Sequence, residues 1–227
     1  MNRQRPAVKP ARAYDSSRRR EQARKAQARV VDVAREMFLQ HGYGATTVAA
    51  IGAAAGVSVE SIYKTFGGKP GLVRAIQEAG LAGVGAVPAP ERSDALSARA
   101  ISPAAIVRGW ATLAAEVTPR VAPIMLLVRS AAASDPDMAV LQEQLSQQRL
   151  ERMTHNARQL AEHGHLRKGL SIENARDVMY TYTAPELYEL LVLSRGWALE
   201  AFGDFVYRGL VAELLEEASP VGRRRSG

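Results

Sequence analysis

Side chains that could carry out catalysis are few in this chain of 227 residues, and their spacing does not assemble an active site. There is no cysteine, which excludes thiol nucleophiles, zinc–thiolate sites and disulfides, and favours a reducing, cytoplasmic setting. Among the four histidines, His163 and His165 have no carboxylate or sulfur cluster at ligand spacing, and no Ser-His-Asp set follows from the spacing. We therefore expect no catalytic residue, no metal site and no cofactor.

Two glycine-rich segments are similar to phosphate-binding loops but lack residues that such loops need. Gly67-Gly68-Lys69 is followed by Pro70, where a P-loop requires Ser or Thr, and the upstream glycine spacing also fails. Residues 80–85 contain three glycines, but they follow a helical pattern instead of the strand that precedes a dinucleotide-binding loop. Neither segment predicts a nucleotide site.

Polar side chains able to contact a charged partner are instead expected on one short helix, residues 59–66. Steps of about 100° per residue place Ile62 and Phe66 on one side of this helix. The same geometry places Glu60 and Lys64 on the opposite side. One face can therefore pack against a core while the other contacts a partner.

The elements that would position this helix form a helix-turn-helix pattern. Apolar residues at spacings of three and four predict a first helix that starts at about residue 20 and ends at a Gly-Tyr-Gly stop. Thr46 and Thr47 supply hydroxyl caps for a second, short helix, after which Gly56 allows a tight turn. Ser58 then caps the third helix. Three helices in fewer than fifty residues, the last two joined by a tight turn, are typical of this motif.

Positive charge is concentrated near the N-terminus. Residues 1–30 contain ten Lys and Arg against Asp15 and Glu21, a net charge of +8, whereas the rest of the chain sums to −1. Such an arm attracts polyanions, of which nucleic-acid phosphates are the commonest; an acidic membrane surface or simple solubility are the alternatives. We expect residues 1–19 to be a disordered basic arm and residues 219–227 a disordered tail.

The helix-turn-helix segment also carries a more specific pattern. It consists of Thr47-Val48, Ile51, Ala55-Gly56-Val57-Ser58, Ile62-Tyr63, Phe66, Lys69 and Leu72. Over about residues 22–78 this pattern resembles the DNA-binding domain of the TetR (tetracycline repressor) family of bacterial transcriptional regulators. The resemblance implies an all-α fold with an N-terminal three-helix DNA-binding domain at 20–80 and its helix-turn-helix at about 47–66. Glycine, proline and alanine cluster between residues 79 and 102 and predict a loop at 81–102. The resemblance further implies a C-terminal helical bundle at 103–218 for ligand binding and dimerisation.

The resemblance implies which residues contact DNA. The start of the third helix enters the major groove, where Val59 can touch a thymine methyl group and Glu60 can accept from a cytosine amino group. Tyr63 and Lys69 match phosphate-contacting positions of the family, and the amides and hydroxyls that begin the second helix suit a phosphate oxygen. The expected DNA-binding residues are Thr46, Thr47, Ser58, Val59, Glu60, Ser61, Tyr63, Lys64 and Lys69.

The second half of the chain is predicted to be helical, because no segment alternates strongly enough for a sheet. The expected helices cover about 103–118, 119–133, 137–163, 171–195 and 197–217. Residues 121–128 are apolar all round and are expected in the interior, with Arg129 pointing into the bundle. By the resemblance, the two C-terminal helices form a homodimer that spaces two DNA-binding heads for a pseudo-palindromic operator.

Members of this family usually bind a small molecule inside the C-terminal helices. Candidate lining residues combine soft apolar surface with sparse polar groups, although ordinary core packing is the commoner role of each one. They are Trp110, Met125, Arg129, Met153, Asn156, Met179, Tyr180 and Tyr182.

The sequence therefore predicts a dimeric DNA-binding regulator, most often a repressor, that an unidentified small ligand releases from its operator. The alternative is a helical ligand-binding or protein-interaction bundle with only non-specific nucleic-acid binding, and an enzyme is a distant third. No membrane span is expected, because the longest uncharged stretch, residues 37–59, contains four glycines and several polar residues.

Overall fold

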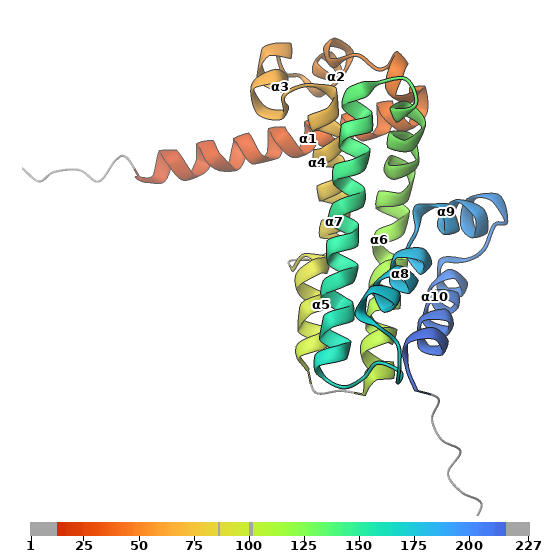
Figure 1. The fold of residues 1–227 in the computed structure, drawn as a ribbon. Helices are drawn as coiled ribbons and strands as arrows, with labels where there is room; N and C mark the ends of the chain where they lie inside the picture. Colours follow the sequence, from red (N-terminus) through yellow and green to blue (C-terminus); the bar gives the residue numbers. More distant parts are fainter. Residues whose placement is uncertain (1–12, 86, 100–101, 217–227) are drawn as a thin grey trace, which may run out of the picture. The chain divides into compact units, whose positions relative to one another are not determined.

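A computed structural model describes residues 13–85, 87–99 and 102–216, and the regular structure in these ranges is entirely helical (Figure 1). The predicted all-α fold class is confirmed. The chain divides into two compact units, residues 1–72 and 73–227. The helices are α1 (Ala13–Ala45), α2 (Val48–Ala55), α3 (Val59–Phe66), α4 (Lys69–Ala82), α5 (Ala89–Ala98), α6 (Pro103–Ala132), α7 (Pro136–Glu162), α8 (Ile172–Tyr182), α9 (Pro185–Tyr188), the π-helix η1 (Glu189–Ser194) and α10 (Leu199–Leu214).

One hydrophobic core holds α1, α2 and α3 together in the first unit. α1 contributes Val30, Ala34 and Phe38, which share one side of the helix and are almost fully buried. Ile51 of α2 and Ile62 of α3 are 0% and 1% exposed. Because Ile62 is the one fully buried residue of α3, the rest of that short helix remains accessible.

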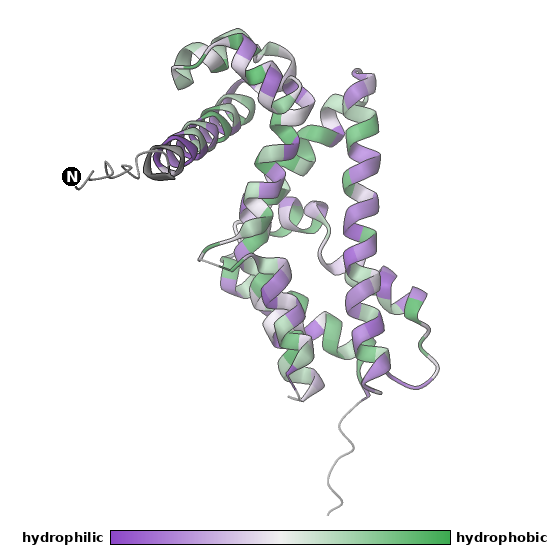
Figure 2. Cartoon of the chain, turned by 90° about the vertical axis from the view of Figure 1, so that its left-hand side faces the viewer, coloured by the Kyte–Doolittle hydropathy of each residue, from purple (hydrophilic) through white to green (hydrophobic). Residues whose placement is uncertain are grey.

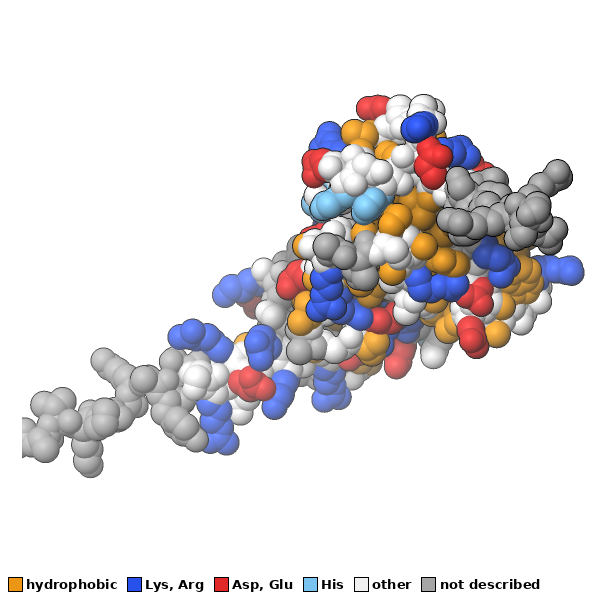
Figure 3. Space-filling view, turned by 90° about the horizontal axis from the view of Figure 1, so that it is seen from below, with side chains coloured by type: hydrophobic (Ala, Val, Ile, Leu, Met, Phe, Trp, Pro, Cys, Tyr) orange, Lys and Arg blue, Asp and Glu red, His pale blue; other side chains and the backbone are white. Residues whose placement is uncertain are grey.

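Part of the predicted disordered arm is helical in the structure and belongs to the N-terminal half of α1. Residues 13–19 are helical, while residues 1–12 and the predicted tail at 219–227 lie outside the described residues. Ala, Gln and Arg favour the helix, and Glu21 pairs within it with Arg24 at 3.2 Å and Lys25 at 3.3 Å. Figure 3 shows blue Lys and Arg side chains outnumbering red acidic ones along this projecting segment.

The turn between α2 and α3 depends on two glycines. Gly56 ends α2 with φ at 72°, in the left-handed region that glycine adopts without strain. Within α2, a Cβ on Gly52 would lie 2.9 Å from the carbonyl oxygen of Val57. The absence of a side chain at Gly52 therefore lets the turn fold back closely onto α2.

The second unit is a helical bundle built around α6 and α7, which pack against each other, with α8 against α7 and α10 against α6. Its core includes Val107 of α6, Leu160 of α7, Met179 of α8 and Phe202 of α10, each at most 2% exposed. Hydrophilic and hydrophobic residues alternate along the helices in Figure 2, as is typical of amphipathic helices.

α6 replaces the two helices predicted at 103–118 and 119–133. Pro119 and Pro123 lie inside it. A proline in a helix removes a hydrogen bond and usually costs about 3 kcal/mol, but here Ala122 and Ile124 are buried on either side of Pro123, and this packing holds the helix together. By length and composition alone, α6 is the one helix among the described residues that could cross a membrane, a test that the core helices of soluble proteins also pass.

Two other predicted segments differ in the structure. The predicted loop at 81–102 contains α5, whose second residue is Pro90, a residue suited to the first turn of a helix. The predicted helix at 171–195 is divided into α8, α9 and η1, because Ala184 is extended before Pro185.

Candidate functional site

α3 presents an accessible polar face, as the predicted 100° steps require. The side chains of Val59 and Tyr63 are 41% and 55% exposed, and Glu60 and Lys64 are exposed as well. Ile62 is buried on the opposite side. A short helix held by one apolar side chain can therefore offer its other residues to a partner.

Two serines fix the N-terminus of α3. Ser58 Oγ accepts a hydrogen bond from the Ser61 backbone N–H at 3.1 Å, which caps the helix. The two hydroxyl oxygens are 2.8 Å apart and share a further hydrogen bond. Both residues remain exposed, so they lie where the sequence predicted them, at the accessible start of α3.

The threonines before α2 have different environments. Thr47 is exposed and its Oγ1 accepts from the Ala50 N–H at 3.1 Å, so it caps α2 as predicted. Thr46 is only 1% exposed, and its hydroxyl lies 2.8 Å from the Gly42 carbonyl oxygen. The predicted DNA contact of Thr46 is therefore corrected: its hydroxyl is used inside the unit, where it ties the end of α1 to the start of α2.

Lys69 also differs from the prediction. Its Nζ donates to the Tyr43 carbonyl oxygen at 2.5 Å and lies 4.0 Å from the centre of the Tyr43 ring. The ammonium group therefore fastens the start of α4 to the last turn of α1, after the kink at Gly42, instead of extending into solvent. Tyr63 lies close by in sequence, with its ring against Gly68: a Cβ there would be 3.3 Å from Tyr63 Cε1.

The second unit contains a partly open cavity of about 330 Å³. Five of the predicted ligand-binding residues line it: Trp110, Met125, Met153, Asn156 and Met179. Sequence reasoning missed the other lining residues, which are Gln77, Leu81, Ala89, Pro90, Ser93, Leu113, Ala114, Val117, Thr118, Val121, Ala122, Leu145, Gln148, Arg149, Arg152, Thr183 and Pro185. The size is within the range of small-molecule sites.

Three predicted lining residues lie outside the cavity, and each has another role. Arg129 points to the surface, where it pairs with Glu186 at 2.7 Å and Glu189 at 3.2 Å, so the prediction that it points into the bundle is wrong. Tyr180 lies beneath the guanidinium of the cavity residue Arg149. Tyr182 packs against Phe205, with ring centres 5.8 Å apart.

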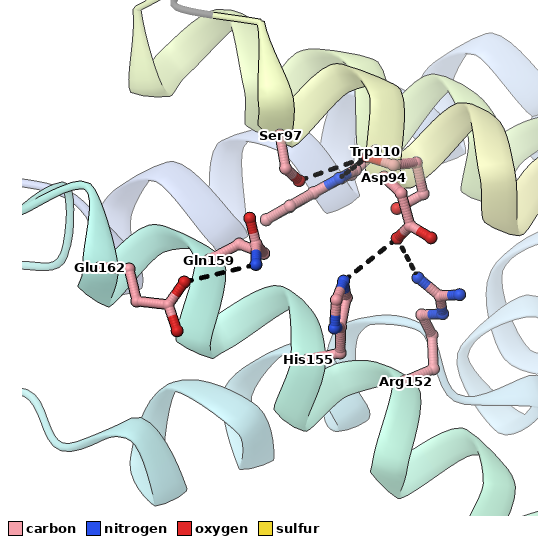
Figure 4. Close-up of polar contacts among 8 residues, drawn as sticks. Asp94, Ser97, Trp110, Arg152, His155, Gln159 and Glu162 are labelled. Atoms are coloured by element: carbon pink, nitrogen blue, oxygen red, sulfur yellow. Dashed lines mark hydrogen bonds and ion pairs between the residues drawn. The ribbon is translucent and has the colours of Figure 1, made fainter.

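Figure 4 shows polar contacts that residues of α5, α6 and α7 make near the cavity. Asp94 of α5 lies between two residues of α7, with its Oδ1 at 2.5 Å from Arg152 Nη1 and 3.2 Å from His155 Nε2. The Trp110 indole donates to the Ser93 carbonyl oxygen at 3.5 Å. Asn156 differs from these residues, because its buried Oδ1 has no hydrogen-bond partner in the described part of the chain.

Arg149 is the second polar residue that stands out at the cavity. Its Nη1 donates to the Tyr180 carbonyl oxygen at 2.6 Å, and its guanidinium carbon lies 3.4 Å from the centre of the Tyr180 ring. Burial lowers the pKa of this guanidinium from its ordinary value. The spacing of Arg149, Met153 and Asn156 along α7, at i, i+4 and i+7, is the signal that could have placed all three on one helix face.

The family and fold comparisons agree with this architecture. Residues 30–76 match the family model described as bacterial regulatory proteins, tetR family. No curated protein matches the chain at the sequence level. Many solved structures share its fold.

Three solved structures illustrate the similarity. SmeT, the repressor of a multidrug efflux pump in Stenotrophomonas maltophilia, solved with triclosan, is 20% identical with a TM-score of 0.67 over 88% of this chain and 96% of its own. The fatty acid degradation regulator FadR of Bacillus halodurans is 18% identical, with a TM-score of 0.66 over 82% and 94%. A regulator from Saccharomonospora viridis in complex with choline is 14% identical, with a TM-score of 0.62 over 85% and 98%. At these identities the likeness shows the fold.

Proposed function

Because residues 30–76 match the family model of the bacterial tetR regulatory proteins, we propose that the chain is a cytoplasmic repressor of this kind, whose α3 reads an operator and which a small molecule in the second unit releases. The observation that carries this proposal is the accessible face of α3 inside the matched residues 30–76. The cavity in the second unit supplies the place for a ligand.

The exposed residues of α3 support direct contact with base edges. Val59 offers methyl groups for the methyl group of thymine, and Glu60 offers a carboxylate for the amino group of cytosine. Tyr63 and Lys64 offer a hydroxyl and an ammonium group for phosphate oxygens. A carboxylate facing DNA repels phosphates. Glu60 therefore lowers the affinity for sequences that offer it no cytosine amino group, as well as binding the one that does.

The exposed basic part of α1 adds a sequence-independent contribution. Between residues 17 and 29 it carries Arg18, Arg19, Arg20, Arg24, Lys25 and Arg29 against Glu21. Cations of this kind neutralise phosphates and release counterions, so they strengthen binding to any duplex and make it depend on salt. Specificity therefore has to come from α3.

α4 follows the DNA-binding helix in the chain and also contributes residues to the cavity. It starts at Lys69, three residues after the end of α3, and its residues Gln77 and Leu81 line the cavity. A ligand that contacts Gln77 and Leu81 in only one of two states would shift the population of those states. By linkage, the ligand then lowers the affinity for DNA by the same factor by which DNA lowers the affinity for the ligand.

Exposed apolar residues near the C-terminus support a homodimer. They are between 37% and 56% exposed and lie within ten residues of one another in sequence, on η1, in the connection after it and at the start of α10: Leu190, Leu193, Trp197 and Leu199. We call them the apolar patch. A two-fold axis through this patch would pair two identical surfaces, and dimeric helix-turn-helix proteins bind half-sites about 34–36 Å apart.

The test is selection of genomic DNA by the full-length protein, followed by gel shifts with the retained fragment and a scrambled fragment of the same length and composition. We expect at least a hundred-fold preference for the retained fragment, because specific binding typically exceeds non-specific binding by about 10³-fold or more. Equal affinities would overturn the proposal and favour the rival, a ligand-binding bundle with only non-specific nucleic-acid contacts.

A further inference from the structure

The two arginines that line the cavity differ in their charge balance. Arg152 is paired with Asp94 at 2.5 Å (Figure 4). Arg149 takes part in no ion pair within the described residues, and it is held by the carbonyl oxygen and the ring of Tyr180. Arg149 is thus a half-buried cation at the cavity wall without a carboxylate of its own.

The acidic residue that acts on Arg149 from farther away makes no ion pair with it within the described residues. Glu186 favours the charged form of Arg149, but its carboxylate is engaged at 2.7 Å by Arg129. A guanidinium remains protonated in proteins, so Arg149 cannot relieve its burial by losing a proton. A desolvated cation of this kind is stabilised when an anion binds it, and a carboxylate matches the planar guanidinium with two parallel hydrogen bonds.

A second unsatisfied polar group lies on the same face of α7. Asn156 is 6% exposed, lines the cavity, and its Oδ1 accepts no hydrogen bond within the described residues. It follows Arg149 by seven residues, which is two turns of helix or about 10.5 Å along the axis. A ligand that satisfies both residues needs an anionic end and a hydrogen-bond donor about two helical turns away.

The apolar lining and the volume of the cavity indicate what the remainder of the ligand is like. Trp110, Leu113, Val117, Val121 and Met125 of α6 supply an apolar wall. A volume of about 330 Å³ lies at the lower end of the range of small-molecule sites. The space therefore suits an apolar chain or ring system of small-molecule size.

We propose that the effector is an apolar monocarboxylic acid whose carboxylate pairs with Arg149 and whose distal hydroxyl or N–H donates to Asn156 Oδ1. This inference rests on the proposed function, because it assigns the chemical class of the ligand that the cavity accepts. Arg152 takes no part in anion recognition, since Asp94 already neutralises it.

Isothermal titration calorimetry on the full-length dimer tests this with four probes of similar length: decanoate, 10-hydroxydecanoate, decan-1-ol and decylamine. We expect decanoate to bind at least ten-fold more tightly than decan-1-ol, because charge-assisted hydrogen bonds to arginine are stronger than neutral ones. Decylamine should bind more weakly than either. 10-hydroxydecanoate should exceed decanoate by about five-fold, because its hydroxyl can reach Asn156.

Two variants test whether Arg149 and Asn156 cause these differences in affinity. Arg149→Gln should lower decanoate affinity at least ten-fold and leave decan-1-ol within three-fold. Arg158→Gln is the matched control, because it removes one positive charge from an exposed position of α7 outside the cavity lining. Asn156→Leu should abolish the advantage of 10-hydroxydecanoate over decanoate and leave decanoate itself within three-fold.

Several results would overturn the proposal: decan-1-ol or decylamine binding as tightly as decanoate, none of the four probes binding, or Arg149→Gln behaving like Arg158→Gln. The comparison among the four probes uses the wild-type protein, so it stands even where a variant fails to fold. Gel shifts without any probe separate the two proposals. Operator preference without carboxylate binding refutes only the inference about the effector, whereas loss of operator preference refutes the proposed function.

Discussion

Arg92 Nη2 of α5 lies 2.6 Å from Glu116 Oε1 of α6, and the second oxygen of the same carboxylate accepts from Arg92 Nη1 at 2.9 Å. Glu116 Oε1 also accepts from the backbone N–H of Val84 at 2.7 Å. One carboxylate therefore joins the start of the α4–α5 connection to both α5 and α6. Because α4, α5 and α6 all contribute to the cavity wall, this ion pair holds the cavity together from one side.

This ion pair makes stability depend on pH. The hydrogen bond from Arg92 lowers the pKa of Glu116 from 4.5 to about 2. A carboxylate whose folded-state pKa is depressed stabilises the fold above its unfolded pKa and loses that contribution as the pH falls through the folded value. Glu116→Gln should therefore cost about 1–3 kcal/mol at pH 7, and the difference from wild type should shrink below about pH 4.5 and vanish near pH 2.

Urea unfolding of both proteins at pH 7, 4.5, 3 and 2 measures this difference. Glu200→Gln is the control, because Glu200 is exposed at the start of α10 and its loss should change stability by no more than about 0.5 kcal/mol. A constant difference between Glu116→Gln and wild type over the whole range would contradict the assigned role of this carboxylate.

Two exposed residues of α3 should have separable effects on DNA. Glu60→Ala should change the ranking of operator variants, because a carboxylate selects among base edges. Lys64→Ala should weaken binding to all sequences alike and lower the slope of log affinity against log salt by about one, because it removes a phosphate contact. Gel shifts with operator variants at several salt concentrations measure both. Identical behaviour of the two variants would argue against a reading role for α3.

Lys69 should affect stability as well as DNA binding. Because its ammonium group is bonded to the Tyr43 carbonyl oxygen and lies over the Tyr43 ring, Lys69→Ala removes contacts within the first unit. We expect a loss of about 1–3 kcal/mol in unfolding free energy together with weaker DNA binding. Lys64→Ala, at an exposed position, should keep wild-type stability. A Lys69→Ala protein that unfolds like wild type would show that this contact contributes nothing.

The sequence predicted the elements that depend on local signals. Spacing and capping residues place α2 and α3 well, because Thr47 and Ser58 bond to amides three residues away. Sequence alone could not show that the Thr46 hydroxyl folds back onto Gly42, or that packing carries α6 through two prolines. Both features depend on tertiary contacts. In the cavity, Met153 and Asn156 were found by residue type. The helical spacing could have placed Arg149 on the same face, but the absence of a carboxylate partner for it is visible only in three dimensions.

Gly52 provides a test of the close approach between α2 and the turn after it. A Cβ at this position would lie 2.9 Å from the Val57 carbonyl oxygen, which is backbone and cannot simply rotate away. Gly52→Ala should therefore destabilise the protein by about 1–3 kcal/mol, although alanine is the better helix former by about 1 kcal/mol. Gly44→Ala, where a Cβ meets nothing within 4 Å, is the control. Thermal or urea unfolding in which Gly52→Ala is as stable as Gly44→Ala would show that the turn relaxes easily.

The apolar patch should be the site of dimerisation. Leu193 is 55% exposed within one chain, so Leu193→Glu should leave the folded protomer intact while placing two like charges near the two-fold axis. We expect self-association to weaken at least ten-fold, with operator binding weakened in parallel, because each protomer then reads only one half-site. Val140→Glu is the matched control: Val140 is 59% exposed on α7, outside the patch, and should remain dimeric. Sedimentation velocity over a range of concentrations distinguishes the two, and a Leu193→Glu protein that sediments like Val140→Glu would place the dimer interface elsewhere.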